Sequence, residues 1–382
     1  TICVSAGMGF ALLGNLRRTY IRARSLEQYR MYKMQQTILT SVSELNRLHF
    51  PMCLISVQDF ENLGKFMPHE TMRDQGRLRF LEMPEIVRQV RDEEGIVFVS
   101  HQWVDFDHPD PLGLQYRATV AAVRKLQQRG IRCCWIWVDY MSIPQRNRTQ
   151  QQNAIDTLAV YVAHSSVFLS VAPSCKHANL DSTMDVRSYN GRGWCRLEQL
   201  IYLAATISSE APPAFACTED GLGPLWGKDA ASSEEEALGV IEGSFTCCSR
   251  GHPGGCPCDK TKIVGVMLGI YWRLLAWHRD LPEPSGRLGK ILEQLEGNMG
   301  RFFPGTVSYK TENGPDDTVE VFGELVTVVR ELFAAESRMP PEDRIWVDPP
   351  PLLELPSEQD LSTPQEVKQV TGMEEEKISM SL

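Results

Sequence analysis

A short stretch beyond the middle of the chain holds a dense group of residues that could bind a metal ion. Cys247, Cys248, His252, Cys256 and Cys258 offer four thiols and one imidazole within twelve residues. Cysteine sulfur and histidine nitrogen are the ligands that zinc prefers in structural sites. Their spacing differs from common zinc patterns, in which a longer stretch separates two ligand pairs. The stretch predicts a zinc site, and the alternative is a glycine-rich surface loop with reduced thiols.

A second group of polar side chains follows two apolar runs in the middle of the chain. Ser100, His101 and Trp103 come directly after the run 96–99, and Asp139 comes directly after the run 133–138. In open parallel α/β sheets, ligands bind outside the carboxyl ends of the strands. These side chains are therefore expected to converge at one edge of a sheet and to form a binding site there.

The elements that would position this site alternate regularly between Gly95 and Cys217. Apolar runs typical of strands buried on both faces are expected at 96–99, 133–138, 166–171 and 214–217. Helical spacing of apolar residues is expected at 117–128, 150–163 and 194–205. Strands that alternate with helices predict an α/β fold with a parallel sheet covered by helices on both faces.

The ends of these elements resemble the Toll/interleukin-1 receptor (TIR) family. Phe98-Val99-Ser100 is similar to the start of the family's opening motif, with His101-Gln102 in place of its Phe-Arg, and Asp139 ends the second strand as in the family. Tyr189, Trp194, Cys195 and Glu198 match the spacing of the plant-type pattern Tyr-Ala-x-Ser-x-Trp-Cys-x-x-Glu-Leu. Arg192 replaces the usual serine, and Leu200 lies one place late. The TIR-like heterokaryon-incompatibility group, with the same fold, is a related match.

The resemblance implies a flavodoxin-like fold and a catalytic role for Glu198 in cleaving the nicotinamide–ribose bond of NAD. Bond breakage builds oxocarbenium character on the ribose, which a nearby carboxylate can stabilise. The predicted substrate-binding residues are Ser100, His101, Trp103, Asp139, Arg146, Arg148 and Trp194. Trp103 would stack on a ring of the dinucleotide, and Arg146 or Arg148 would meet its phosphates.

A non-catalytic signalling module is the competing function. It would associate with itself or with other TIR-like domains through the loop 141–148, which follows the second strand. The enzyme reading also implies self-association, because a neighbouring domain completes the site in that family. The alternative to a catalytic role for Glu198 is that it is a solvated helix residue paired with Arg192.

The remaining segments are predicted as additions to the domain at 95–217. They comprise an apolar and basic helical arm at 1–48, a lead-in at 49–94, a Gly- and acid-rich insertion with the cysteines at 218–260, a C-terminal helical region at 261–337, with helices at 263–277 and 318–333, and a disordered Pro/Glu-rich tail at 338–382. The apolar run 2–16, followed by a basic stretch from Arg17 to Lys33, would suit attachment to a membrane through the N-terminus.

Composition restricts the class of partner. A formal net charge of -10 argues against general nucleic-acid binding, which depends on neutralising phosphates with Lys and Arg. Eleven cysteines without a recognisable secretory signal indicate reduced thiols or metal ligands, and hence a cytoplasmic protein.

Overall fold

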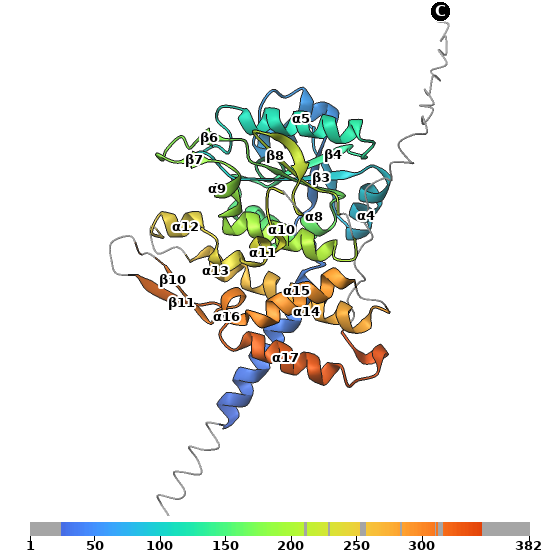
Figure 1. Ribbon diagram of the computed structural model, residues 1–382, viewed down its shortest axis with the longest axis vertical. Helices are drawn as coiled ribbons and strands as arrows, with labels where there is room; N and C mark the ends of the chain where they lie inside the picture. Colours follow the sequence, from blue (N-terminus) through green and yellow to red (C-terminus); the bar gives the residue numbers. More distant parts are fainter. Residues whose placement is uncertain are drawn as a thin grey trace, which may run out of the picture.

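A central seven-stranded sheet organises the fold in a computed structural model of the chain (Figure 1). The structure describes residues 24–345 apart from 210–211, 228–229, 253–256, 283–284, 310 and 312–315. The strands lie in the order β2-β1-β4-β3-β5-β8-β9. Their bounds are β1 (Met52–Ser56), β2 (Arg79–Leu81), β3 (Ile96–His101), β4 (Trp135–Val138), β5 (Val167–Val171), β8 (Ala214–Thr218) and β9 (Gly221–Pro224).

The four middle strands, β4, β3, β5 and β8, are parallel, as the alternation of strands and helices predicts. Strand β3 is buried along its whole length, because successive side chains enter two different apolar layers. Phe98 belongs to the larger core, stacked between Trp137 and Phe168, whereas Val97 and Val99 belong to the other core. The prediction of an α/β fold is confirmed, but the sheet is only mostly parallel, because β1, β2 and β9 pair antiparallel.

Helices cover both faces of this sheet. The smaller core lies under α2 (Val57–Glu61), α3 (His69–Asp74) and α5 (Leu114–Gln128). The larger core lies under α4 (Pro84–Glu93), α8 (Leu158–Ala163) and α10 (Gly193–Ala205). The helix expected at 150–163 is divided at Thr157 into α7 (Arg148–Asp156) and α8. Short elements complete this part of the chain: α6 (Asp139–Ser142), β6 (Cys175–Lys176), β7 (Thr183–Met184), α9 (Val186–Asn190), α11 (Glu234–Leu238) and η1 (Val240–Glu242).

The segment 49–94 is more than a lead-in, because it contributes two strands to the sheet. Strand β1 pairs antiparallel with β4, and β2 pairs antiparallel with β1. Met52, Cys53, Leu54 and Ile55 are fully buried. The sheet therefore begins well before Gly95. Strands β1 and β2 were missed because they pair antiparallel and stand outside the regular alternation of parallel strands and helices.

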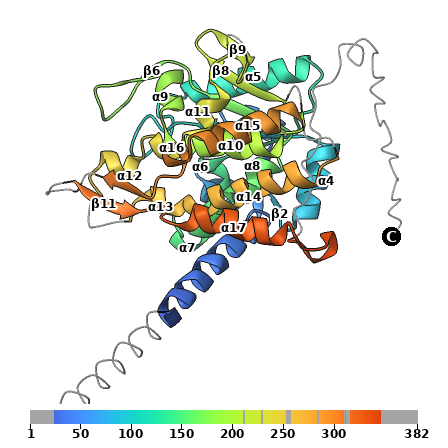
Figure 2. The ribbon, with the colours of Figure 1, turned by 60° about the horizontal axis from the view of Figure 1, so that its bottom comes forward.

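A second layer of helices packs beneath α8 and α10 (Figures 1 and 2). It contains α14 (Val264–Asp280), α15 (Gly286–Gly297), α16 (Met299–Phe302) and α17 (Leu325–Glu336), preceded by α12 (Thr246–Ser249) and α13 (Asp259–Lys262). The 3-10 helix η3 (Pro341–Asp343) follows, and Ile345 packs against the larger core, so the start of the tail predicted as disordered at 338–382 is instead part of the fold. Residues 346–382 lie outside the described residues.

The prediction of one helix at 318–333 is wrong in its first part. Residues 317–320 form β11 (Asp317–Glu320), which pairs with β10 (Thr306–Tyr309) in a hairpin. Gly323 follows with φ +50°, a left-handed conformation that interrupts the chain before α17 begins at Leu325. The β-branched Thr318 and Val319 suit the strand, which helical spacing alone had obscured.

The N-terminal arm is helical over residues 24–44, drawn in blue in Figure 2. Its Ile38, Val42 and Leu45 are buried in the larger core, with Met31 and Met34 packed against it. The apolar run 2–16 and the start of the basic stretch lie outside the described residues. Within the described part of the chain, no helix combines the length and apolar character needed to cross a membrane.

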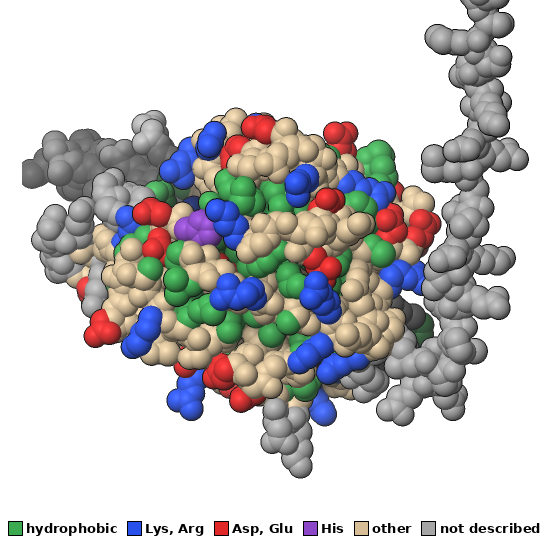
Figure 3. All heavy atoms as spheres, turned by 90° about the horizontal axis from the view of Figure 1, so that it is seen from above, with side chains coloured by type: hydrophobic (Ala, Val, Ile, Leu, Met, Phe, Trp, Pro, Cys, Tyr) green, Lys and Arg blue, Asp and Glu red, His purple; other side chains and the backbone are tan. Residues whose placement is uncertain are grey.

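The face over α5 carries both basic and acidic side chains among polar and apolar ones (Figure 3). Charges of the two signs occur across this face instead of gathering by sign. A face of this kind presents no single stripe of positive potential.

Candidate functional site

Three elements bring Glu198 and Ser100 together at the carboxyl end of β3. Ser100 is the fifth residue of that strand and lies opposite Ser170 of β5. Glu198 belongs to helix α10, and its side chain points towards the sheet. There the Ser100 hydroxyl donates a hydrogen bond of 2.5 Å to Glu198 Oε2. The hydroxyl of Tyr189, from α9, lies 2.7 Å from the same Ser100 oxygen. The carboxyl group of Glu198 is therefore fixed by a serine that is itself held in place.

The environment of Glu198 favours its neutral form. Burial raises the pKa of Glu198 to about 8, and the negative charge of Asp139 acts in the same direction. The hydrogen bond from Ser100 and the charges of His101 and Arg192 oppose this rise. A carboxyl group with such a pKa changes charge near neutral pH, which is unusual outside functional sites. Arg192 acts on Glu198 by charge, but its own hydrogen bond goes to Thr246 Oγ1.

His101 and Asp139 form an ion pair beside this carboxyl group. The Nε2 atom of His101 lies 2.7 Å from Asp139 Oδ1, and its Nδ1 lies 2.6 Å from Gln115 Oε1. The Gln115 amide donates its own hydrogen to the carbonyl of Gln102, which leaves its oxygen facing His101. Both ring nitrogens of His101 thus face oxygen acceptors, the arrangement of an imidazolium.

The pKa directions agree with this assignment. Burial alone would lower the pKa of His101, but the charge and hydrogen bond of Asp139, with the bond to Gln115, raise it. Burial would raise the pKa of Asp139, but His101, the indole N–H of Trp103 and the amide of Tyr140 lower it. Trp103 Nε1 donates to Asp139 Oδ2 over 2.8 Å. Asp139 is therefore an anion in a cluster where Glu198 is neutral.

Two carboxyl groups with opposite pKa shifts in one cluster are typical of acid–base or electrostatic catalysis. Asp139 serves as a permanent anion, whereas Glu198 can gain or lose a proton as its surroundings change. Comparison of the chain with protein-family models, with curated proteins and with solved structures gave no match. The chemistry of the site therefore has to be argued from its geometry.

Five of the residues predicted for the site meet in the structure: Ser100, His101, Trp103, Asp139 and Glu198. Gln115 and Tyr189 hold the cluster from outside it. Tyr189 belongs to the sequence pattern around Glu198, but nothing in the sequence pointed to Gln115, because an amide at a helix start has no distinctive spacing.

The other three predicted residues lie apart from this cluster. Arg146 and Arg148 are exposed, and Arg148 contacts Gln151 over 3.2 Å. The loop that carries them is fixed by Glu70, whose Oε1 accepts from the backbone amides of Gln145 and Arg146 at 2.8 Å each. Neither arginine bonds to Glu198 or Asp139, so the structure does not bring them into the cluster.

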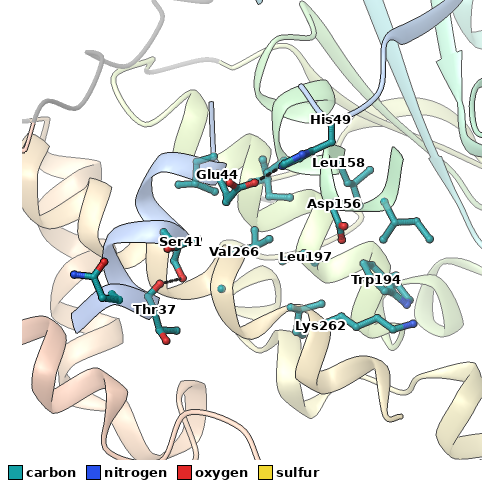
Figure 4. Close-up of a pocket in the computed structure, with 18 of the residues that line it drawn as sticks. Thr37, Ser41, Glu44, His49, Asp156, Leu158, Trp194, Leu197, Lys262 and Val266 are labelled. Atoms are coloured by element: carbon teal, nitrogen blue, oxygen red, sulfur yellow. Dashed lines mark hydrogen bonds and ion pairs between the residues drawn. The ribbon is translucent and has the colours of Figure 1, made fainter. Parts of the chain in front are cut away.

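Trp194 lines a separate cavity of about 540 Å³ (Figure 4). This cavity lies between the helix at 24–44, α8, α10 and α14, and its wall includes Leu158, Leu197 and Lys262. His49 and Glu44 are bonded to each other on its rim. Trp194 donates to Asp259 Oδ2 over 3.2 Å, and Glu198 is not part of this wall. The prediction that Trp194 contacts the same substrate as Glu198 gains no support from this position.

The predicted metal ligands also gather, at a distance in sequence from the site above. One ligand atom from each of Cys247, Cys248, His252 and Cys258 lies within 4.8 Å of the others. The fifth predicted ligand, Cys256, lies outside the described residues. A group of three thiols and one imidazole has the composition of a structural zinc site.

Helix α10 starts at a glycine for a steric reason that can be tested. A Cβ atom on Gly193 would lie 2.1 Å from the ring of Phe245. We expect Gly193→Ala to lower the free energy of unfolding by about 1–3 kcal/mol, because the ring must move to make room. Urea unfolding followed by circular dichroism measures this change. Gly289→Ala, in α15 with no atom within 4 Å of the new Cβ, is the control and should be neutral or stabilising.

Proposed function

We propose that the chain carries a TIR-like α/β domain whose Ser100–Glu198 site cleaves the nicotinamide–ribose bond of NAD. The four parallel strands support a flavodoxin-like reading. Across the sheet they lie in the order β4, β3, β5, β8. When the four strands are numbered by their order in the chain, this spatial order is 2-1-3-4. That is the order of the corresponding flavodoxin-like strands.

The position of Glu198 carries the proposal. In a sheet of this order, the strand order reverses between β3 and β5, and ligands bind outside the carboxyl ends of the strands at that point. Ser100 stands at the end of β3 opposite β5, and Glu198 is bonded to it. This position of the carboxyl group supports the proposal, because sheets of this order bind nucleotides at that edge.

The charge of the substrate suits a carboxyl group with a raised pKa. The nicotinamide ring of NAD is a cation, and its approach favours the ionised form of Glu198. As the bond between nicotinamide and C1′ of the ribose breaks, its electron pair leaves with the ring, which departs as neutral nicotinamide. The positive charge then lies on the ribose, where the Glu198 carboxylate would stabilise it. Water adds at C1′ and loses a proton, giving ADP-ribose.

The test is nicotinamide release from NAD by purified protein, at high concentration so that self-association can occur. Wild type should release nicotinamide, and Glu198→Gln should lose at least about a hundredfold in rate, the typical effect of removing one electrostatic stabiliser. Glu293→Gln, an exposed glutamate of α15, is the matched control and should retain the wild-type rate. Equal rates in wild type and Glu198→Gln would reject the assignment.

A second candidate function is a non-catalytic TIR-like scaffold. The observation that favours it is the loop after β4, where Glu70 holds the backbone while the side chains of Arg146 and Arg148 remain exposed. A rigid loop with exposed cations suits contact with another domain. Absence of nicotinamide release from assembled wild type would favour this function, and loss of assembly in Arg146→Ala/Arg148→Ala would support it.

A further inference from the structure

We propose that Cys247, Cys248, His252 and Cys258 bind one zinc ion, which clamps the start of α10. This inference is independent of the proposed NAD chemistry. The four residues come from α12, from the turn after it and from the residue before α13. His252 and Cys258 are buried, and the two remaining thiols are partly buried.

Three distances from the sulfur of Cys248 are close to those expected between ligands of a tetrahedral zinc ion. Zinc–sulfur bonds of about 2.3 Å and zinc–nitrogen bonds of about 2.0 Å place neighbouring ligands about 3.6–3.8 Å apart at tetrahedral angles. The sulfur of Cys248 lies 3.9 Å from that of Cys247, 3.5 Å from that of Cys258 and 3.8 Å from His252 Nε2. The Cys248 sulfur thus lies at the distances from two sulfurs and one nitrogen that binding of a common ion would give.

The backbone around the cluster also suits thiolate ligands. The amide of Asp259 points at the sulfur of Cys247 over 3.3 Å, and such amides stabilise sulfur that carries negative charge. His252 has φ +55°, a conformation uncommon for a residue with a side chain, and this turn brings its ring to the thiols. On binding zinc, the three thiols would release their protons and the neutral imidazole would donate its lone pair.

The clamp follows from contacts on both flanks of the cluster. Before α12, Ser244 pairs with the chain at Gly191 and Gly193 through two backbone hydrogen bonds of 2.8 and 2.9 Å. Thr246 accepts from the Arg192 guanidinium over 2.7 Å. After the cluster, Asp259 accepts from Trp194. Joining these flanks through one ion would fix residues 191–194, from which α10 and Glu198 follow.

The cluster also lies against the β10–β11 hairpin, and both ribbon views place α12, α13 and this hairpin side by side (Figures 1 and 2). The ring of His252 meets the ring of Tyr309 edge-on, with centroids 4.6 Å apart. An aromatic ring in this position would shield one side of a bound ion from solvent. The surroundings are therefore those of a structural site, which needs no open position for water.

The test uses the full chain, purified with its thiols reduced and in the presence of zinc. We expect about one zinc per chain by elemental mass spectrometry. Cobalt in its place should give the visible bands of a tetrahedral thiolate site. Cys258→Ser should lose stoichiometric zinc, Cys258→His should retain it with a weaker sulfur-to-cobalt band, and Cys134→Ser, at an exposed cysteine outside the cluster, should match wild type.

A second readout tests the clamp without any measurement of activity. Removing zinc with a chelator should speed hydrogen exchange at residues 191–196 more than in α15. Wild type that folds with the three thiols free and binds no zinc would overturn the site, and so would a disulfide between Cys248 and Cys258, which mass spectrometry detects. Zinc binding with unchanged exchange at 191–196 would overturn the clamp.

Discussion

Glu198→Gln is expected to stabilise the folded protein by about 2–4 kcal/mol at pH 8 and by little at pH 4.5. The pKa of Glu198 is about 8 in the folded chain and has an ordinary value of 4.5. At a pH between 4.5 and about 8, the Glu198 carboxyl group is ionised in the unfolded chain and protonated in the folded chain. The contribution of Glu198 to stability is therefore intact below about 4.5 and falls as pH rises towards 8. Glutamine stays neutral and avoids this loss.

Urea unfolding of both proteins at several pH values between 4.5 and 8 measures the effect. Glu293→Gln should run parallel to wild type throughout, because that side chain is exposed and belongs to α15, away from the cluster. Parallel curves for wild type and Glu198→Gln would mean that the Glu198 carboxyl group is solvated. If Glu198→Gln stabilises the protein as expected, the glutamate lowers the stability of the fold. A residue that lowers stability is typical of a functional site.

Asp139→Asn should have the second large effect, a loss of about 2–3 kcal/mol near neutral pH. Asp139 accepts from His101, from Trp103 and from the backbone of Tyr140, and an asparagine amide presents hydrogens to one of these donors. The loss should be smaller than for a fully buried pair, since the Asp139 side chain is 31% exposed and His101 is 1% exposed.

The pH dependence of this loss identifies its cause. The folded pKa of His101 is raised above 6.5, so its contribution disappears as pH rises through that raised value. The folded pKa of Asp139 is lowered below 3.8, so its contribution disappears as pH falls through that lowered value. The difference between wild type and Asp139→Asn should be largest between these limits. Trp103→Phe removes one neutral donor and should cost about 1 kcal/mol without this pH profile.

Much of the sheet could be predicted from the sequence because its middle strands are short apolar runs. Ile96–Val99 reads as a buried strand on its own, and the polar residues that end it are the ones that meet in the cluster. Glu198 was singled out by the resemblance of Tyr189, Trp194 and Cys195 to a TIR pattern, and a helix after a parallel strand returns over the sheet.

The features of the fold and the site that were not predicted depend on contacts between residues distant in sequence. Gln115 faces His101 only because α5 begins at the edge where β3 ends. The N-terminal helix packs at Leu45 against Gly269 of α14, more than two hundred residues later. The pKa of Glu198 arises from burial, which no local pattern reports. Arg146 and Trp194 were assigned from adjacency to the strand ends, whereas in the structure Glu70 fixes the backbone at Arg146 and Asp259 accepts from the indole of Trp194.

The antiparallel strands that flank the parallel strands have a consequence for assembly. An exposed strand edge is a template for another chain, and proteins blunt such edges with short strands, charges, glycine or proline. Strand β2 has three residues and presents Arg79, while β9 reads Gly-Leu-Gly-Pro. Both margins of the sheet are therefore poor acceptors for a further strand. Copies of this chain should resist joining into a continuous sheet, the geometry of amyloid, and any ordered assembly would have to use helices and loops.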